Sequence, residues 1–484
     1  MTLLEYAERI RTDALSEIGH ENLDVNEQFF TPSQVAELMA GMLTKDSRFP
    51  ASVRLLDPGA GSGILTVAAV ERIKALFPET EIQITAVEKD SALLSSLNET
   101  FSAIAQNFEG VEYQIINDNF VYWATQGDTI FNTTVDSQKY DLIIQNPPYA
   151  KLPAKGAESI HLRKLGIHAP NIYAAFMALG ERLLTENGKM VSITPRSWMN
   201  GTYFTKFRDM LLHDSHLSAI HTFESRREVF KDTDVLQEAV ITTVTRSRSK
   251  ASEVEISISK SQAHDIATRT VSYSSVVVNG VIFVPATDED ADAVSWMSRA
   301  RCQLEEVQIQ VSTGRVVAFR NKQSLATSET ENTVPMVYAE NFRAGNLVHP
   351  APKSKKPQFY QVTDTGADKN LVPPGTFVLV KRFSAKEEKR RITAAIWSSN
   401  SSAAFDNKTN FFHVSGQGLP PDTAEGLCKW LNSSRVDRFF RVFSGHTQVN
   451  AGDLRMMPYP TPEQLQAIGG IDAAADDSVK AVLG

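Results

Sequence analysis

Short apolar blocks alternate with longer amphipathic segments in the first half of the chain. Each block is too short for a helix and ends at glycine, proline, asparagine or an acid, which predicts a buried strand. The longer segments repeat apolar residues at helical spacing. Strands that alternate with helices predict an α/β fold whose largely parallel sheet has helices on both faces. The predicted strands are 53–56, 82–87, 113–116, 141–145, 189–194, 217–223 and 239–244, and the predicted helices include 1–20, 64–76, 92–108, 171–184 and 203–213.

The pattern changes near residue 250, where the alternation stops. Short strands are predicted at 253–259, 271–278 and 281–284, and an acidic stretch at 288–292 marks a boundary. We therefore expect three parts. They are a domain over 1–285, a mixed α+β domain over 286–462, and a loose tail over 463–484, which is rich in alanine and aspartate.

The stretch 141–149, Asp-Leu-Ile-Ile-Gln-Asn-Pro-Pro-Tyr, predicts a strand that stops at a stiff corner. Pro147 and Pro148 have fixed φ and no N–H group, so the strand cannot continue through them. Open α/β sheets bind ligands at this edge. Asn146 Oδ1 and the Pro147 carbonyl could accept from a planar NH₂ group, and Tyr149 could stack on the ring that bears it. The alternative is a plain turn with asparagine as turn former.

A glycine-rich loop follows the first strand, in the sequence Asp57-Pro-Gly-Ala-Gly-Ser-Gly63. Asp57 would repel a pyrophosphate, whereas it would attract the ammonium group of a ligand that carries an amino acid. No lysine follows the glycines, which excludes a P-loop. The loop therefore favours S-adenosylmethionine over a dinucleotide. Its candidate contacts are Asp57, Gly59, Ala60, Gly61 and Gly63.

Acidic residues also follow the next two predicted strands. Glu88 follows 82–87, where a carboxylate can accept from both hydroxyls of a ribose. Asp118 follows 113–116 and could accept from an adenine amino group, with Phe120 packed against the ring. Each acid alone is more often a cap or turn residue. Together with the acid of the glycine loop, they indicate one nucleoside site at one edge of the sheet.

Other segments could complete this site. Thr31 is the expected N-cap of a helix with Pro32 at its first position, where free N–H groups can bind a carboxylate; simple capping is the alternative. Phe230, an apolar residue in a polar loop, is expected either to contact an extruded base or to anchor the loop. Residues 150–170 are expected to be a mobile loop over the substrate or a plain surface insertion.

The charge distribution modifies the picture given by the overall composition. A net charge of −8 disfavours nucleic-acid binding, but residues 301–460 hold about 21 lysines and arginines against about 14 acids. Basic residues there alternate with aromatic and hydroxyl residues, which suits phosphate contacts with some base readout; ordinary fluctuation is the alternative. The candidate contacts are Lys381, Arg382, His446, Gln448 and Asn450.

The remaining composition limits the location and the chemistry. No apolar run approaches eighteen residues and the N-terminus lacks the apolar region of a signal peptide, so no membrane association is expected. Cys302 and Cys428 lie far apart without a metal-type spacing. A reducing cytoplasm and a reaction without a metal are therefore expected.

The order of these motifs resembles that of the gamma-class N6-adenine DNA methyltransferases of bacterial type II restriction-modification systems, over roughly residues 25–245. The resemblance implies a Rossmann-like methyltransferase sheet, S-adenosylmethionine as donor, double-stranded DNA as substrate and a C-terminal target recognition domain. It also implies a monomer that works with a separate cognate restriction endonuclease, since no nuclease segment is evident. It rests on Phe30-Thr31-Pro32, the loop from Asp57 to Gly63, Glu88, Asp118 and Asn146-Pro-Pro-Tyr149.

The implied reaction is methylation of adenine N6 at a specific site, which protects host DNA. The target base must leave the stack, because its N6 is paired inside the duplex. Tyr149 and Phe230 would hold the extruded base, and the corner would accept from its amine. One rival is a methyltransferase of RNA or of a protein glutamine. The Thr31 segment and the basic C-terminal part argue against it. The other is a non-catalytic DNA-binding subunit, against which the intact acids stand.

Overall fold

The computed structural model describes residues 1–18, 31–47, 49–126, 139–223, 239–259, 265–278, 280–343, 345–362, 369–384, 388–444 and 448–484. Three predicted site residues, Phe30, Phe230 and His446, lie outside this described part of the chain. The chain divides into two compact units, unit 1 (Met1–Ala286) and unit 2 (Thr287–Gly484).

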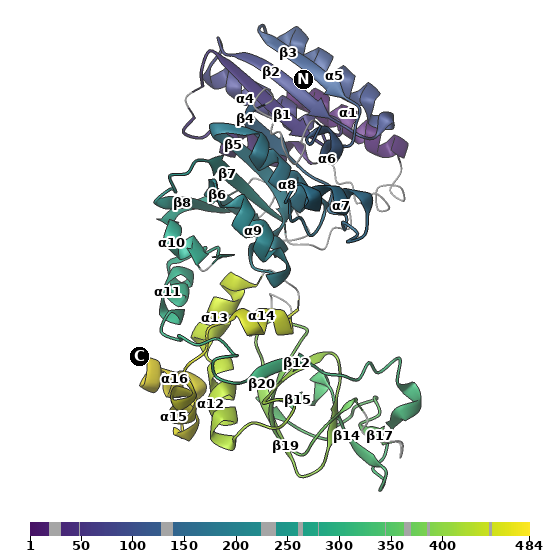
Figure 1. The fold of residues 1–484 in the computed structure, drawn as a ribbon, viewed down its shortest axis with the longest axis vertical. Helices are drawn as coiled ribbons and strands as arrows, with labels where there is room; N and C mark the ends of the chain where they lie inside the picture. The colour runs from purple at the N-terminus through teal and green to yellow at the C-terminus, as the bar shows by residue number, and fades with distance from the viewer. Residues whose placement is uncertain are drawn as a thin grey trace. The chain divides into compact units, whose positions relative to one another are not determined.

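Unit 1 is built on a sheet of nine strands in the order β3-β2-β1-β4-β5-β7-β6-β8-β9 (Figure 1). The first five of these are parallel, in two runs that diverge from β1 and β4. β7 lies between β5 and β6 and is antiparallel to both. In a dinucleotide-binding sheet, by contrast, the sixth strand lies directly beside the fifth. The strands are β1 (Ser52–Pro58), β2 (Glu81–Val87), β3 (Val111–Ile116), β4 (Tyr140–Gln145), β5 (Leu184–Pro195), β6 (Ser215–Phe223), β7 (Ala239–Arg246), β8 (Glu253–Ser259) and β9 (Ala267–Ser272), with the separate hairpin of β10 (Val277–Val278) and β11 (Val281–Ile282).

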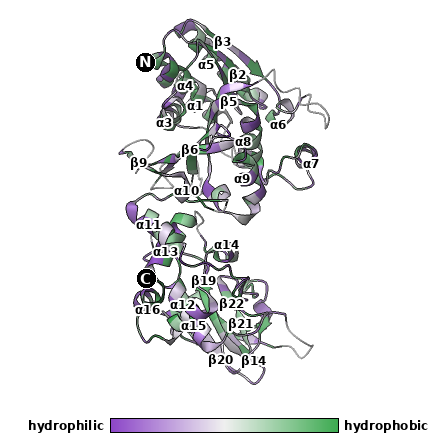
Figure 2. Ribbon diagram, turned by 60° about the vertical axis from the view of Figure 1, so that its left-hand side comes forward, coloured by the Kyte–Doolittle hydropathy of each residue, from purple (hydrophilic) through white to green (hydrophobic). Residues whose placement is uncertain are grey.

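Helices cover both faces of this sheet, which confirms the predicted fold class (Figure 1). Successive strand residues point to opposite faces, so Leu55 belongs to the core with α3 and α4, and Leu56 to the core with α8. Green, hydrophobic positions run along the strands in Figure 2. The helices are α1 (Leu3–Ile18), α3 (Ser33–Thr44), α4 (Ile64–Leu76), α5 (Leu94–Asn107), α6 (Phe120–Trp123), α7 (Ala157–Lys164), α8 (Ile172–Leu183), α9 (Thr205–Leu211) and α10 (Tyr273–Val276), with 3-10 turns η1 (Ser91–Leu93), η3 (Arg196–Met199) and η4 (Thr202–Phe204).

Some predictions of local structure are wrong. Residues 150–170 are not simply a loop, because they contain α7, whose Leu162 is buried and whose last turn carries three basic residues that favour a helix C-terminus. The N-cap of α3 is Pro32 rather than Thr31, whose hydroxyl has another partner described below. Part of 271–278 is the helix α10 instead of a strand. The acidic stretch 288–292, expected to mark a boundary, does follow the division between the two units, but it belongs to a helix that begins with a complete capping box.

Unit 2 combines two small sheets, in the orders β12-β22-β19-β20 and β13-β17-β14-β21-β18, with the two-stranded sheet β15-β16 and a set of helices. It is therefore the mixed α+β structure that the sequence predicts. The strands are β12 (Gln310–Thr313), β13 (Leu325–Ala326), β14 (Thr333–Val337), β15 (Phe342–Arg343), β16 (Asn346–Leu347), β17 (Phe359–Gln361), β18 (Leu371–Val372), β19 (Gly375–Lys381), β20 (Ala394–Ser399), β21 (Ala403–Phe405) and β22 (Thr409–His413). The helices are α11 (Asp288–Met297), α12 (Pro421–Leu431), α13 (Ser434–Phe443), α14 (Ala451–Met456), α15 (Pro462–Gly470) and α16 (Ala475–Leu483), with 3-10 turns η5 (Lys322–Ser324) and η6 (Ala339–Asn341).

The expected loose tail over 463–484 consists instead of two packed helices, α15 and α16. Leu465 and Ile468 of α15 are fully buried. Glycine allows α15 to lie directly on α12, because a Cβ atom on Gly426 would come 1.8 Å from Leu465 O. Reciprocally, a Cβ atom on Gly469 would come 2.1 Å from Asp422 O. Composition alone could not reveal this packing, because the two backbones meet only where glycine has no Cβ atom.

Candidate active site

The site lies where the strand order of the sheet reverses. β1 pairs with β2 on one side and with β4 on the other, and both β1 and β4 end at the same edge. Ligands of open α/β sheets bind in the crevice at this switch point. The glycine loop leaves β1 here, and the Asn-Pro-Pro-Tyr corner leaves β4 beside it.

A pocket of about 300 Å³ occupies this crevice. Its volume is at the lower end of the range that holds small-molecule ligands. It joins the glycine loop, the ends of β2 and β3, and the corner after β4. Of the residues predicted from the sequence, those that line it are Gly59, Gly61, Glu88, Asp118, Phe120, Asn146 and Pro148.

The glycine loop is shaped by three left-handed residues. Gly59, Gly61 and Gly63 have φ values of +72°, +57° and +85°. The N–H groups of Gly59 and Ala60 donate to Val87 O at 2.7 and 3.2 Å, which ties the loop to the end of β2. The chain can therefore pass close to a ligand at this edge.

Asp57, at the end of β1, is completely buried. Its Oδ2 accepts a hydrogen bond of 2.7 Å from the Thr66 hydroxyl, while Oδ1 has no hydrogen-bond partner among the residues that the structure describes. Burial raises the pKa of Asp57 to about 7, with a smaller contribution from the nearby Glu88 and an opposing one from the Thr66 hydrogen bond. Asp57 is not among the described residues that line the pocket. A buried carboxylate oxygen of this kind suits a cationic group that replaces its lost hydration.

Glu88 links the glycine loop to the segment after β2. Its Oε2 accepts from Gly61 N and its Oε1 from Asp90 N, both at 2.8 Å. Burial raises the pKa of the Glu88 carboxyl, and these backbone N–H groups oppose that rise. Each carboxylate oxygen can accept a further hydrogen bond, so Glu88 can support the loop and also bind hydroxyl groups.

Asp118 and Phe120 line the pocket from the end of β3. Asp118 Oδ1 accepts from Asn119 N at 2.7 Å, and Asn119 Oδ1 caps α6 by accepting from Val121 N at 2.9 Å. The Phe120 ring is 97% buried and lies 4.7 Å from the ring of Phe176. The end of β3 thus gives the pocket a carboxylate beside an aromatic wall.

The corner after β4 is held from both sides. Asn146 Nδ2 donates to Thr31 Oγ1 at 3.0 Å, a bond between residues 115 positions apart. On the other side, Ile172 N donates to Ala150 O at 3.1 Å and Lys151 pairs with Asn171. The Thr31 hydroxyl therefore fixes the plane of the Asn146 amide.

Tyr149, which was predicted to stack on the ring that bears the amine, is largely buried. Its side chain is only 6% exposed, and its ring meets Tyr173 edge-on at 6.2 Å between centroids. Burial raises the pKa of Tyr149 far above its ordinary value. Tyr149 is not among the described residues that line the pocket. Its stacking on a base stays a prediction.

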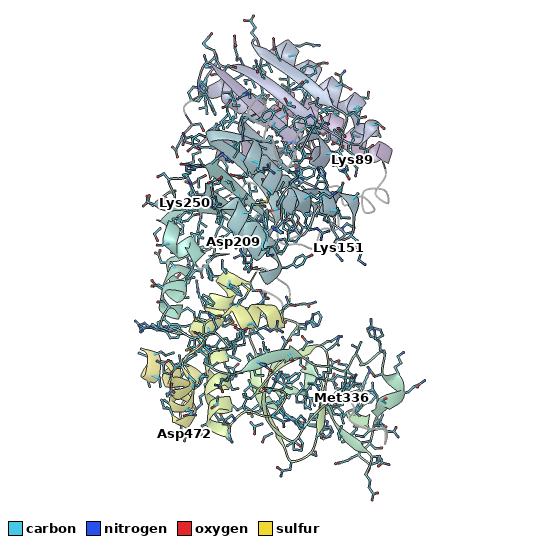
Figure 3. The ribbon with its side chains drawn as sticks, viewed as in Figure 1. Lys89, Lys151, Asp209, Lys250, Met336 and Asp472 are labelled. Carbon is cyan, nitrogen blue, oxygen red and sulfur yellow. The ribbon has the colours of Figure 1, made fainter. Side chains whose placement is uncertain are left out.

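The pocket also contains residues that the sequence did not single out. Lys89 follows β2 and Lys151 follows the corner; Figure 3 shows both on the same side of unit 1. Glu158 reaches the pocket from α7. The position of Lys89 directly after Glu88 could have revealed it, but nothing local to Glu158 points to a site, because its segment has weak periodicity.

In unit 2, the structure brings two of the predicted segments together. Val449 N donates to Arg382 O at 2.7 Å, and Phe383 pairs with Gln448. Phe383 is 48% exposed, with Lys408 Nζ 5.9 Å from the centre of its ring. Asn450 is engaged in the capping box of α14. Lys381 lies at the end of β19, with its Nζ 5.9 Å from the Phe342 ring.

Among the described residues, no group of three or more histidine, cysteine or acidic side chains is placed to hold a metal ion. None of the described helices combines the length and apolarity that crossing a bilayer requires.

Sheet order, glycine loop and proline corner together define a Rossmann-like methyltransferase. The Eco57I restriction-modification methylase family model matches residues 71–230. The chain is 36% identical to the type II methyltransferase M.PstI of Providencia stuartii, over 96% of this chain and 94% of that protein. It is 37% identical to M.BsuBI of Bacillus subtilis, over 91% and 89%. The chain therefore belongs to the type II methyltransferases of restriction-modification systems.

A solved structure supports the fold over both units. The type IIL restriction-modification enzyme MmeI superposes with a TM-score of 0.53 over 99% of this chain and 75% of that chain, at 13% sequence identity. This likeness concerns the fold alone.

Proposed function

We propose that the chain is a DNA methyltransferase that transfers a methyl group from S-adenosylmethionine to N6 of an adenine extruded from duplex DNA. The observation that carries the proposal is the meeting of two motifs in one pocket. Asn146 and Pro148 of the corner line the same pocket as Gly59 and Gly61 of the glycine loop. Membership of the type II methyltransferases supports methyl transfer as the reaction.

The described residues fit S-adenosylmethionine as cofactor. Oδ1 of Asp57 is buried and unused among the described residues, which suits the ammonium group. Glu88 would accept from ribose hydroxyls, while Asp118 and Phe120 would bind the adenine. When bound, the cofactor supplies a methyl group that is already electrophilic on its sulfonium.

The corner would prepare the target amine. Asn146 Oδ1 and Pro147 O would accept the two N6–H groups, which directs the nitrogen lone pair toward the pocket. The hydrogen bond from Asn146 Nδ2 to Thr31 supports this role, because it restricts the amide to one plane. Acceptors fixed before the reaction stabilise the positive charge that develops on the amine. Tyr149 and Phe230 are proposed to hold the extruded ring.

Unit 2 is proposed to bind and read the duplex. The excess of basic residues over 301–460 supports contacts with the phosphate backbone. Lys381, Arg382 and Gln448 come from two segments that the structure joins, with Phe383 and Lys408 beside them. This arrangement supports contacts to phosphates from the lysines and to base edges from the remaining side chains.

Transfer of labelled methyl groups tests the proposal directly. The protein is incubated with labelled S-adenosylmethionine and duplex DNA, structured RNA or a mixture of proteins, and the modified base is identified after digestion. N6-methyladenine in duplex DNA is expected. Label in RNA or on glutamine, or none in any arm, would refute the proposal. Asn146→Ala should retain binding of both ligands and lose about a hundredfold in kcat.

A further inference from the structure

The segment 150–165, which leaves the proline corner, contributes part of one wall of the candidate active-site pocket. Lys151 and Glu158 line the pocket from this segment. Ser159 and Leu162 of α7 are buried at 7% and 1% exposure, so the helix is anchored and does not lie loosely on the surface. The wall therefore belongs to the folded site.

Two side-chain hydrogen bonds fasten α7 to the chain around α6. Asn119 Nδ2 donates to Glu158 Oε1 at 2.7 Å, and Thr125 Oγ1 lies 2.7 Å from His161 Nε2. The first bond lies at the pocket, because both of its residues line it. Thr125 and His161 are not among the described lining residues. The bond from Asn119 to Glu158 is therefore a contact within the site, whereas the bond between Thr125 and His161 only attaches the helix.

Asn119 connects Asp118, the start of α6 and Glu158. Its N–H donates to Asp118 Oδ1 and its Oδ1 accepts from Val121 N, so it orients the carboxylate and begins α6 at once. Its Nδ2 is the donor to Glu158. A hydrogen bond to a carboxylate is stronger than one between neutral groups and defines the position of its partner more tightly. The Asn119 amide is thus held at both ends, by Val121 N at its oxygen and by Glu158 at its nitrogen.

We propose that Glu158 is a positioning residue for the cofactor. By accepting from Asn119, it holds Asp118 and Phe120 in the arrangement that binds the adenine end of S-adenosylmethionine. The inference rests on the proposed function only in assigning this pocket to that cofactor. It adds that cofactor affinity depends on α7, a helix that continues directly from the catalytic corner.

Isothermal titration of the full-length protein with S-adenosylmethionine, without DNA, tests this inference. Glu158→Ala should weaken binding about tenfold, the effect of losing one charge-assisted hydrogen bond. Glu158→Gln should stay within about threefold of the wild type, because its amide oxygen still accepts from Asn119. His161→Ala is the matched control, because it removes the other bond to α7 and should also stay within about threefold.

Exchanging the donor and the acceptor of this hydrogen bond tests whether a loss of affinity comes from the bond or from general damage to the site. Asn119→Asp keeps the cap of α6, since aspartate caps as well as asparagine. It removes the donor and places two carboxylates together, so cofactor binding should fall at least as far as in Glu158→Ala. Adding Glu158→Gln to this variant supplies an amide donor at position 158 for the carboxylate at position 119. Binding should recover by several-fold.

The outcomes decide the inference clearly. Wild-type affinity in Glu158→Ala, an equal loss in His161→Ala, or no recovery in the double variant would overturn it. In methyl transfer, Glu158→Ala should raise KM for S-adenosylmethionine with kcat preserved at saturation. If the wild type binds the cofactor but transfers no methyl group to DNA, the proposed substrate is wrong while the binding series still tests Glu158.

Discussion

Gly63→Ala is expected to destabilise unit 1 and to disturb the glycine loop. Gly63 has a φ of +85°, which costs an L-residue roughly 1–2 kcal/mol. The added Cβ atom would lie 2.8 Å from Phe101 Cε1 and 3.0 Å from Leu97 Cδ1. Both side chains are completely buried, so neither can move aside freely, and such overpacking costs roughly 1–3 kcal/mol. The free energy of unfolding should therefore fall by about 2–5 kcal/mol.

Urea denaturation of the variant and of a matched glycine variant measures this effect. Gly41→Ala is the control, because Gly41 lies inside α3 and a Cβ atom there would meet nothing within 4 Å. That substitution should be neutral or stabilise the protein by up to about 1 kcal/mol. The comparison separates the conformational demand at Gly63 from a general effect of alanine.

A double-mutant cycle with Phe101→Leu identifies the steric part. Because leucine leaves space where the Phe101 ring stood, the two substitutions together should be less harmful than their sum, by about 0.5–3 kcal/mol. A Gly63→Ala protein within about 0.5 kcal/mol of the wild type would refute the reasoning. Strict additivity with Phe101→Leu would show that the ring is not the obstacle.

Further predictions concern charge, pH and DNA contacts. The affinity for S-adenosylmethionine should rise as pH increases through about 7, where the buried Asp57 loses its proton, and Asp57→Asn should weaken binding and flatten this titration; an unchanged profile in the variant would exclude Asp57 as the source. Burial lowers the pKa of His221 to about 4. The unfolded chain therefore binds this proton at higher pH than the folded chain, so the free energy of unfolding should fall between about pH 6.5 and 4, by up to roughly 3 kcal/mol. Urea titrations at pH 7.5 and 5 should show a smaller loss in His221→Gln than in the wild type, and an equal loss would contradict this origin. Lys408→Met should reduce the slope of log affinity for DNA against log salt by about 1 and leave site preference intact. Phe383→Ala should reduce site preference instead, and identical effects of both variants in competition binding would rule out this division of roles.

The strands, the glycine loop and the corner could be predicted because their signals are local. A strand that ends in Asp57 and continues into alternating glycines is readable within a dozen residues. The same holds for Asn146 before two prolines, since the proline ring determines where the strand stops. In a parallel sheet the carboxyl ends of all strands lie at one edge, so the predicted strands already bring these residues together.

The remaining features depend on contacts between distant segments. Thr31 was expected to cap its own helix, but its hydroxyl meets Asn146, and no local pattern encodes that partner. The burial of Tyr149 could not be predicted either, because its ring packs against Tyr173 of α8, 24 residues further along the chain. Glu158 was missed because its function depends on Asn119, which approaches it only in the folded chain.

The close approach of α12 and α15 has a practical consequence for protein engineering. Gly426 and Gly469 let the two backbones touch, so a side chain at either position would push α15 away from α12. A shortened protein ending near Pro462 would lose the buried Leu465 and Ile468 and would uncover the face of α12 on which Gly426 lies, so it should be prone to aggregation. Affinity tags and fluorescent fusions should therefore not replace α15 and α16.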